Sequence, residues 1–214
     1  MEKTLKTIIK RPVRIIGAGR TDSGVHASGQ VIAFDLEWSH QLEALQKALN
    51  VNLPQDVAVV SLTTTDSNFH PRFDALSRQY RYTILNQPVR DVLRRRYTML
   101  VRQPLNLSIM QEAGQLFLGQ QDFASFGRPP QGDNTVRTIT QIDWAVSGAE
   151  IKFEITANAF LYRMVRNIVG TLIQVGLGNL TPAEVEAILL ARDRSQGAVP
   201  ALPSGLCLVK VNYA

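Results

Sequence analysis

The sequence alternates between segments with the apolar spacing of helices and segments with the alternation of strands. Apolar residues recur every three or four positions along residues 160–175, which predicts a central core helix. Similar spacing predicts helices at residues 1–9, after a capping Ser39, at about 107–118 and after Thr181. Alternating or β-branched runs predict strands at residues 13–18, 29–36, 57–64, 77–85, 139–146, 151–157 and about 205–213.

Local signals connect these elements into an α+β arrangement. A Ser-Gly pair at 147–148 predicts a hairpin, and a Thr-Pro-Ala-Glu run at 181–184 predicts a helix start with a capping box. The hairpin and the half-polar strands favour an antiparallel sheet with helices on one face. We expect two units without a linker, residues 1–66 and residues 67–214.

Composition narrows the class of protein. A chain of 214 residues with 45% apolar positions suits one large or two small globular domains and excludes a disordered tail. Cys207 has no internal disulfide partner, no stretch approaches the roughly 20 apolar residues of a membrane span, and a soluble, cytoplasmic protein is expected. No metal is expected either, because partner spacing for a metal site is lacking around His26, His40 and His70.

Positive charge is concentrated in one stretch. The whole chain carries +5, yet residues 67–102 hold eight arginines against two aspartates, with aromatic residues among them. The planar guanidinium of arginine can donate two hydrogen bonds to one phosphate, and aromatic rings stack on unpaired bases. The stretch is therefore either a phosphate-binding strip for nucleic acid or a solvated basic face.

A glycine-rich turn at residues 17–27 carries an acid between two predicted strands. A dinucleotide fingerprint would need glycine in place of Asp22, and a serine-hydrolase elbow would need glycine in place of Thr21. Two interpretations of Asp22 remain: a functional acid held in a tight turn, or an aspartate that bonds its own backbone.

Two pairs of side chains have both ordinary and functional interpretations. Tyr80 and Tyr82 alternate on one strand and face the same side, as an ordinary cross-strand aromatic pair would. Arg163 and Arg166 are neighbours on the surface of an otherwise apolar helix. Each arginine either meets an acid or a phosphate there, or reaches solvent along its aliphatic stem.

Longer blocks of sequence occur in a fixed order along almost the whole chain. They read GRTDSGVH at 19–26, NLP at 52–54, FHPRF at 69–73, RQYRY at 78–82, DFASF at 122–126 and NAFLYRMVRNIVG at 158–170. Together these blocks resemble the TruA family of tRNA pseudouridine synthases. The resemblance implies a pseudouridine synthase fold of two ferredoxin-like or RRM-like halves, with a mostly antiparallel sheet and a central RNA-binding cleft. It also implies a cofactor-free isomerase that converts uridine to pseudouridine in the anticodon stem-loop of tRNA, at positions 38 to 40.

The resemblance also implies roles for individual residues. Asp22 falls on the catalytic aspartate, Tyr80 on the tyrosine that stacks on the base, Arg166 on the arginine partner of the aspartate, and Arg20 on an arginine that displaces the flipped base. A homodimer that shares one tRNA is the implied assembly. The residues expected to contact tRNA are Phe69, His70, Arg72, Phe73, Arg78, Arg94, Arg95 and Arg96.

One departure from the family is large. The opening strand of the family, with its Asp-Gly turn, has no counterpart here, and Met1 corresponds to the middle of the first helix. We expect the natural chain to begin upstream and the 214-residue form to be poorly stable and slow. The alternative function is a noncatalytic RNA-binding module that lost activity with this strand. A hydrolase using Asp22 and His26 is a weaker third interpretation, because an irregular turn does not fix their shared orientation.

Overall fold

The chain divides into two compact units in the computed structural model, which describes all 214 residues. Unit 1 comprises Met1–Gly19 and Val31–Asp74, and unit 2 comprises Arg20–Gln30 and Ala75–Ala214. This division differs from the expected 1–66 and 67–214, since the segment that carries Asp22 packs with the C-terminal residues. No helix in either unit has the length and apolar character needed to cross a membrane.

Unit 1 is a small assembly of two helices and one pair of short strands. Its elements are α1 (Glu2–Ile9), β1 (Ile16–Gly17), β3 (Ile32–Ala33) and α2 (Leu42–Asn52), and β1 pairs with β3 in antiparallel fashion. Apolar side chains from both helices and from the intervening segments form its core. The buried members are Leu5, Val13, Leu45, Leu49 and Leu53.

Four expectations for the N-terminal part of the chain are wrong in detail. The strands expected at 13–18 and 29–36 shrink to two residues each, and no strand forms at 57–64. A β-branched run becomes a strand only where a neighbouring strand supplies a ladder of hydrogen bonds. Here the Val59 backbone instead bonds the side chain of Asn50, at 2.7 and 2.9 Å. Ser39 does not cap α2, whose N-cap is Gln41 without a side-chain bond.

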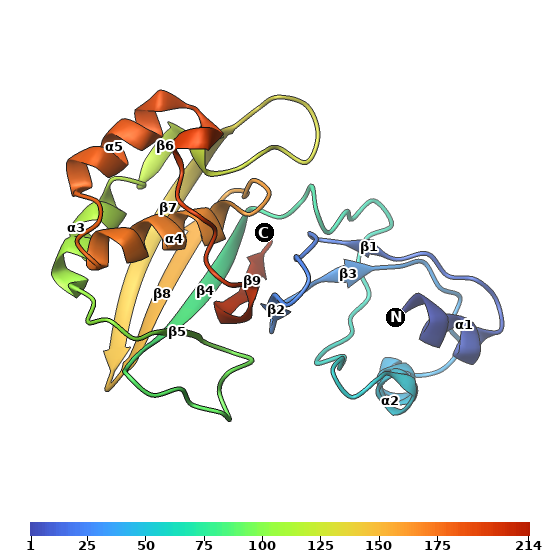
Figure 1. The fold of residues 1–214 in the computed structure, drawn as a ribbon. Coiled ribbons are helices and arrows are strands. Elements are labelled where there is room, and N and C mark those ends of the chain that lie inside the picture. Colours follow the sequence, from blue (N-terminus) through green and yellow to red (C-terminus); the bar gives the residue numbers. More distant parts are fainter. The chain divides into compact units, whose positions relative to one another are not determined.

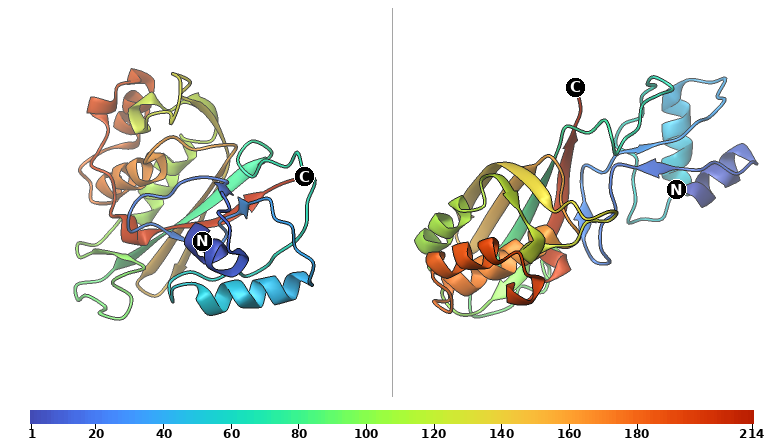
Figure 2. Two further views of the ribbon diagram at one scale, coloured as in Figure 1. Left: turned by 90° about the vertical axis from the view of Figure 1, so that its right-hand side faces the viewer. Right: turned by 90° about the horizontal axis from the view of Figure 1, so that it is seen from above.

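Unit 2 is a seven-stranded sheet with helices on one face, which confirms the α+β expectation (Figure 1). The sheet order is β2 (His26–Ala27), β9 (Leu206–Asn212), β4 (Ser77–Asn86), β8 (Glu150–Ala157), β7 (Val136–Ser147) and β6 (Gly119–Asp122), with β5 (Met99–Val101) beside β4. Only the β2–β9 and β4–β5 pairs are parallel. Figure 2 shows the same one-sided layer of helices from above: α3 (Leu107–Gln115), α4 (Met164–Gly176) and α5 (Pro182–Ala191).

Helix α4 is the central core helix that its apolar spacing predicted. It begins at Met164, not at 160, because Arg163 takes a left-handed conformation with φ 61° and ends the preceding extended segment. The capping box of α5 is present, with Thr181 and Glu184 bonded to each other's backbone N–H groups. The hairpin between β7 and β8 turns through Gly148, whose φ of 58° favours glycine.

A segment without secondary structure, residues 197–202, crosses helix α4 on its way from the 3₁₀ turn Arg194–Gln196 to the 3₁₀ turn Pro203–Gly205 (Figure 1). We call residues 197–202 the crossing segment. It approaches α4 most closely at Gly170, where a Cβ atom would lie 2.2 Å from the carbonyl oxygen of Val199. Only glycine permits this approach, and the position of the crossing segment matters for the site below.

Candidate active site

The loop that carries Asp22 is fastened to the sheet of unit 2. Its continuation forms β2, which pairs with β9, and the N–H groups of Ser28 and Gly29 both donate to the carbonyl of Leu208. Val25 packs against the hydrophobic core, and its N–H donates to the carbonyl of Asp22 at 3.0 Å. Gly24 turns the chain with φ 81°. The backbone on both sides of Val25 is thereby attached to the sheet and the core of unit 2.

Asp22 forms an ion pair with Arg166 of helix α4. An Nη atom of Arg166 lies 2.8 Å from Oδ2 of Asp22, and the exposed fractions of the two side chains are only 12% and 19%. A close, mostly buried pair of this kind interacts far more strongly than one in solvent. For Arg166, the interpretation as an arginine that reaches solvent is therefore wrong.

Arg166 is itself held by the crossing segment. Its Nε atom donates to the carbonyl of Ala201 at 2.8 Å, and the N–H of Ala201 donates to the carbonyl of Arg166 at 2.9 Å. The guanidinium therefore has one anchor on the crossing segment and presents another edge to Asp22. This second anchor lies 35 residues away in sequence, and no pattern in the sequence pointed to it.

Arg163 is a second cation beside the same carboxylate. Its Nε atom lies 3.6 Å from Oδ2 of Asp22, and its guanidinium covers the ring of Tyr162 at 4.9 Å from the centroid. The side chain is 46% exposed. Sequence reasoning paired Arg163 with Arg166 on one helix face but gave Arg163 no role at the site.

Tyr80 lies on β4 with its ring against the edge of Phe160, at 5.1 Å between centroids. Burial raises the pKa of its phenol, and the negative charge of Asp22 raises that pKa further while Arg78 lowers it. The phenol is therefore protonated at neutral pH. Tyr82, two residues on, is fully buried and donates to the carbonyl of Leu202 at 2.7 Å, so it belongs to the core.

Arg20 begins the segment that belongs to unit 2, two residues before Asp22. Its side chain is exposed and makes no hydrogen bond or ion pair. An exposed arginine without a partner is free to adopt a new position when a ligand binds. Its assignment as the residue that displaces the base stays a prediction.

The arginines of the basic stretch fall into two groups within unit 2. Arg78 donates to the carbonyls of Ala75 and Asn158, and Arg94 forms ion pairs with Asp91 at 2.7 Å and Glu150 at 3.1 Å. These two side chains support the protein itself. By contrast, Arg95 and Arg96 are exposed and form no ion pair.

The predicted tRNA contacts in unit 1 form a stacked group on an exposed loop. The rings of His70 and Phe73 stack at 4.2 Å between centroids, and the Arg72 guanidinium lies 5.5 Å from the Phe73 ring. Phe73 is 72% exposed, so its ring is accessible to a base. Phe69 precedes the group and is half-buried.

His26 is engaged in structural contacts. Its Nε2 donates to the carbonyl of Arg96 at 2.6 Å, and its ring lies 4.9 Å from that of Tyr97. No hydrogen bond or ion pair joins its ring to the Asp22 carboxylate, so the structure does not support the hydrolase interpretation. The structure shows no cluster of three or more His, Cys, Asp or Glu side chains placed to hold a metal ion.

Comparisons with known proteins give the same family as the motifs. The sequence profile of the family described as tRNA pseudouridine synthase matches residues 1–74 and 113–214. A tRNA pseudouridine synthase A of Pseudothermotoga lettingae is 41% identical over 214 residues, which covers 99% of this chain and 87% of that relative. The protein of the same name from Bacillus subtilis is 40% identical over 216 residues, with 100% and 87% covered. The chain thus belongs to the TruA family of tRNA pseudouridine synthases, which are isomerases.

Proposed function

We propose that this protein converts uridine to pseudouridine in the anticodon stem-loop of tRNA, at positions 38 to 40. One observation carries the proposal: the carboxylate of Asp22 is held 2.8 Å from Arg166 in a mostly buried pair. The family membership supports the chemistry, and the motif blocks around Asp22 and Arg166 support the site.

The reaction rearranges one nucleoside without adding or removing an atom. The bond between C1′ of the ribose and N1 of uracil breaks, and a bond between C1′ and C5 forms. The proton on C5 leaves to solvent, and N1 gains a proton. The bonds balance within the substrate, so the chemistry needs no oxidant, no reductant and no group donor.

Each residue of the site has a part in this reaction. Asp22 acts on the nucleoside as a charged nucleophile or charge partner, and Arg166 holds that carboxylate in place. Tyr80 stacks on the extruded uracil, which replaces part of the unstacking loss of a few kcal/mol. Because its phenol stays protonated at neutral pH, Tyr80 is also a proton donor within the site. Arg20 occupies the place that the flipped base leaves.

The test uses tRNA tritiated at C5 of uridine, because pseudouridine formation releases that hydrogen to water. The parent protein is expected to release tritium. The Asp22→Asn protein keeps its size and hydrogen bonding but loses its charge, so it is expected to release none while binding tRNA within a few-fold of the parent. Tritium release by Asp22→Asn at the parental rate would refute the role of Asp22.

The same experiment separates the two functional alternatives. A noncatalytic RNA-binding module would bind the tRNA and release no tritium in any form, the parent included. We further propose that the active assembly is a homodimer, as the family resemblance implies. Light scattering of the purified protein measures its mass directly, and a monomer at working concentrations that turns over tRNA would refute the homodimer. The cytoplasmic location stays a prediction.

A further inference from the structure

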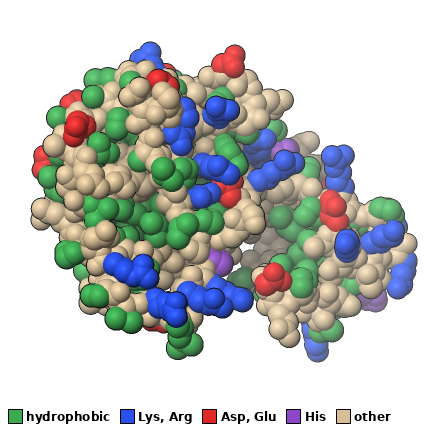
Figure 3. Space-filling view, viewed as in Figure 1, with side chains coloured by type: hydrophobic (Ala, Val, Ile, Leu, Met, Phe, Trp, Pro, Cys, Tyr) green, Lys and Arg blue, Asp and Glu red, His purple; other side chains and the backbone are tan.

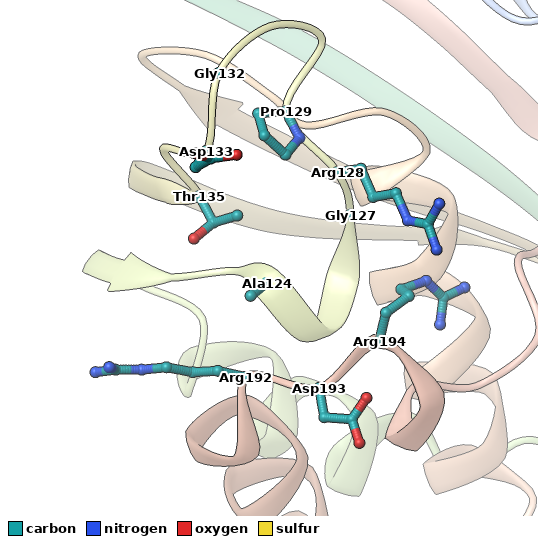
Figure 4. A pocket seen from close by; sticks show the side chains of 10 residues that line it. All are labelled: Ala124, Gly127, Arg128, Pro129, Gly132, Asp133, Thr135, Arg192, Asp193 and Arg194. Carbon is teal, nitrogen blue, oxygen red and sulfur yellow. The ribbon is translucent and has the colours of Figure 1, made fainter.

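Unit 2 has an open hollow of about 560 Å³ between two segments that the proposed function has not used. One wall is the loop that follows the 3₁₀ turn Ala124–Phe126, and the other is the turn that follows helix α5. Three arginines line it: Arg128 from the first wall, and Arg192 and Arg194 from the second. In Figure 4 the side chains of Arg128 and Arg194 extend toward the same side, while that of Arg192 extends the opposite way.

Arg194 is held in place by a neutral partner. One of its Nη atoms donates to Oδ1 of Asn167 at 2.9 Å, and Asn167 is only 1% exposed, with its own amide donating to the carbonyl of Phe126 at 2.6 Å. Arg194 itself is half-buried and forms no ion pair. A partly buried guanidinium without a carboxylate partner has N–H donors left over for an anion.

Arg128 is fixed at its backbone and free at its side chain. Its carbonyl accepts from the N–H of Tyr162 at 2.8 Å, and the preceding Gly127 lies so close to Leu161 that a Cβ atom would be 2.5 Å from the Leu161 side chain. The guanidinium of Arg128 is exposed and has neither a hydrogen bond nor an ion pair. The hollow therefore presents a second unpaired guanidinium from a fixed backbone position.

Most carboxylates near the hollow already form ion pairs or hydrogen bonds with groups other than Arg128 and Arg194. Asp122 lies 3.4 Å from Arg192 and accepts from Thr135, so it offsets that arginine and neither of the other two. Asp193 accepts from the backbone and the hydroxyl of Ser195, which lower its pKa. Asp133 lies on the exposed loop and forms no ion pair.

The hollow is linked to the active site through residues 162–167, the start of helix α4 and the residues just before it. Asn167, which holds Arg194, directly follows Arg166, which holds Asp22. Tyr162, which bonds Arg128, directly precedes Arg163, the second cation beside Asp22. Asn167 thus holds the Arg194 side chain and Tyr162 holds the Arg128 backbone, and each lies next to an arginine that contacts Asp22. On the face drawn in Figure 3, unit 2 carries several Lys and Arg side chains.

We propose that Arg128 and Arg194 form a binding site for a backbone phosphate of the tRNA strand whose uridine reacts at Asp22. Arginine matches phosphate in charge and in the geometry of its donors. A phosphate bound there fixes the register of the strand relative to Asp22, because the adjacent α4 residues Asn167 and Arg166 hold Arg194 and Asp22 respectively. This inference rests on the proposed function for its ligand, and it adds a contact outside the basic stretch of residues 67–102.

The test compares the parent with Arg128→Ala, Arg194→Ala and a control, Lys47→Ala, which removes one exposed charge from helix α2. Dissociation constants for tRNA are measured over about 50 to 200 mM salt, where phosphate contacts dominate the salt dependence. Each arginine variant is expected to raise Kd by roughly three- to tenfold and to reduce the slope of log Kd against log salt by about 0.7 to 0.9. Lys47→Ala should leave the slope unchanged.

Repeating the measurement with an isolated anticodon stem-loop locates the phosphate. Effects on both RNAs place it within the stem-loop, and effects on full-length tRNA alone place it outside. Arg194→Ala also removes the hydrogen-bond partner of the buried Asn167, so its thermal stability is measured alongside its affinity. The Arg128 side chain bonds no other residue, so Arg128→Ala tests the phosphate site even if Arg194→Ala unfolds.

The experiments distinguish a failure of the phosphate-site proposal from a failure of the proposed function. Tritium release by Lys47→Ala should match the parent at every tRNA concentration, whereas Arg128→Ala should need more tRNA to reach its maximal rate because it has lost a binding contact. If Arg128→Ala keeps the parental Kd and salt slope, the phosphate site is refuted even though the parent still releases tritium. If the parent releases none, the isomerase is refuted, and the slopes still show whether the hollow binds the RNA backbone.

Discussion

Replacing Gly170 by alanine tests whether the crossing segment positions the ion pair of Asp22 and Arg166. The added Cβ atom would lie 2.2 Å from the carbonyl oxygen of Val199 and 3.2 Å from the N–H nitrogen of Ala201, whereas ordinary contacts begin at 3.4 Å. Both of these partners are backbone atoms, so no side chain can rotate away. The crossing segment must therefore move by roughly 1 Å, a distance at which core overpacking is felt.

The displacement reaches Asp22 through two hydrogen bonds. Ala201 accepts from Nε of Arg166 at 2.8 Å and donates to the Arg166 carbonyl at 2.9 Å, and Arg166 in turn lies 2.8 Å from Asp22. A misplacement of about 1 Å at a catalytic group costs on the order of 100-fold in rate. We therefore expect kcat of Gly170→Ala to fall by about 10- to 100-fold, with tRNA affinity nearly unchanged.

The effect on stability is expected to be smaller than the effect on activity. Overpacking costs about 1 to 3 kcal/mol, and alanine gains about 1 kcal/mol over glycine inside a helix. The net loss of up to about 2 kcal/mol corresponds to a fall in Tm of no more than about 8 °C for a chain of this size. Tritium release measured well below this Tm separates positioning from unfolding.

Gly114→Ala is the matched control. Gly114 is also a buried helical glycine, in α3, but its added Cβ would lie 3.5 Å from the nearest atom, an indole nitrogen of Trp144. It should therefore keep or slightly raise Tm and leave tritium release unchanged. If Gly170→Ala loses stability but turns over tRNA as fast as the parent, the crossing segment does not position Arg166, and the reasoning fails.

Three further predictions follow from the site and the core. Tyr80→Phe keeps the stacking ring and should retain tRNA binding, whereas Tyr80→Leu loses about 1 to 3 kcal/mol of stacking; equal single-turnover rates and affinities in all three proteins would contradict the role of Tyr80. Alanine at Arg95 or Arg96 should lower the salt slope of tRNA binding by about 0.7 to 0.9 each, and alanine at Arg94 should lower it less, because that side chain already pairs with two carboxylates. Burial raises the pKa of Tyr82, so above pH ~10 the unfolded chain loses a proton that the folded chain keeps, and stability falls. Urea unfolding at rising pH should show this fall in the parent and a weaker one in Tyr82→Phe.

Local sequence signals were sufficient for the elements whose formation depends on near neighbours. The apolar spacing of α4, the Thr181 capping box and the turn at Gly148 all depend on contacts within a few residues, and each is present as predicted. The motif blocks were likewise sufficient to assign the family and to single out Asp22. The same local reasoning failed at 57–64, because a strand requires a partner that the run itself does not supply.

Tertiary structure alone decided which charges meet. Asp22 and Arg166 are 144 residues apart in sequence, and Arg194 and Asn167 are 27 apart. The sequence does not distinguish Arg94 from its neighbour Arg95, yet only Arg94 forms an ion pair with Glu150. The physical reason is that the strength of an ion pair depends on the separation and burial of its charges, and the packing of helices on the sheet sets both. The apolar period of a helix and the identity of its capping residue, by contrast, can be read directly from the sequence.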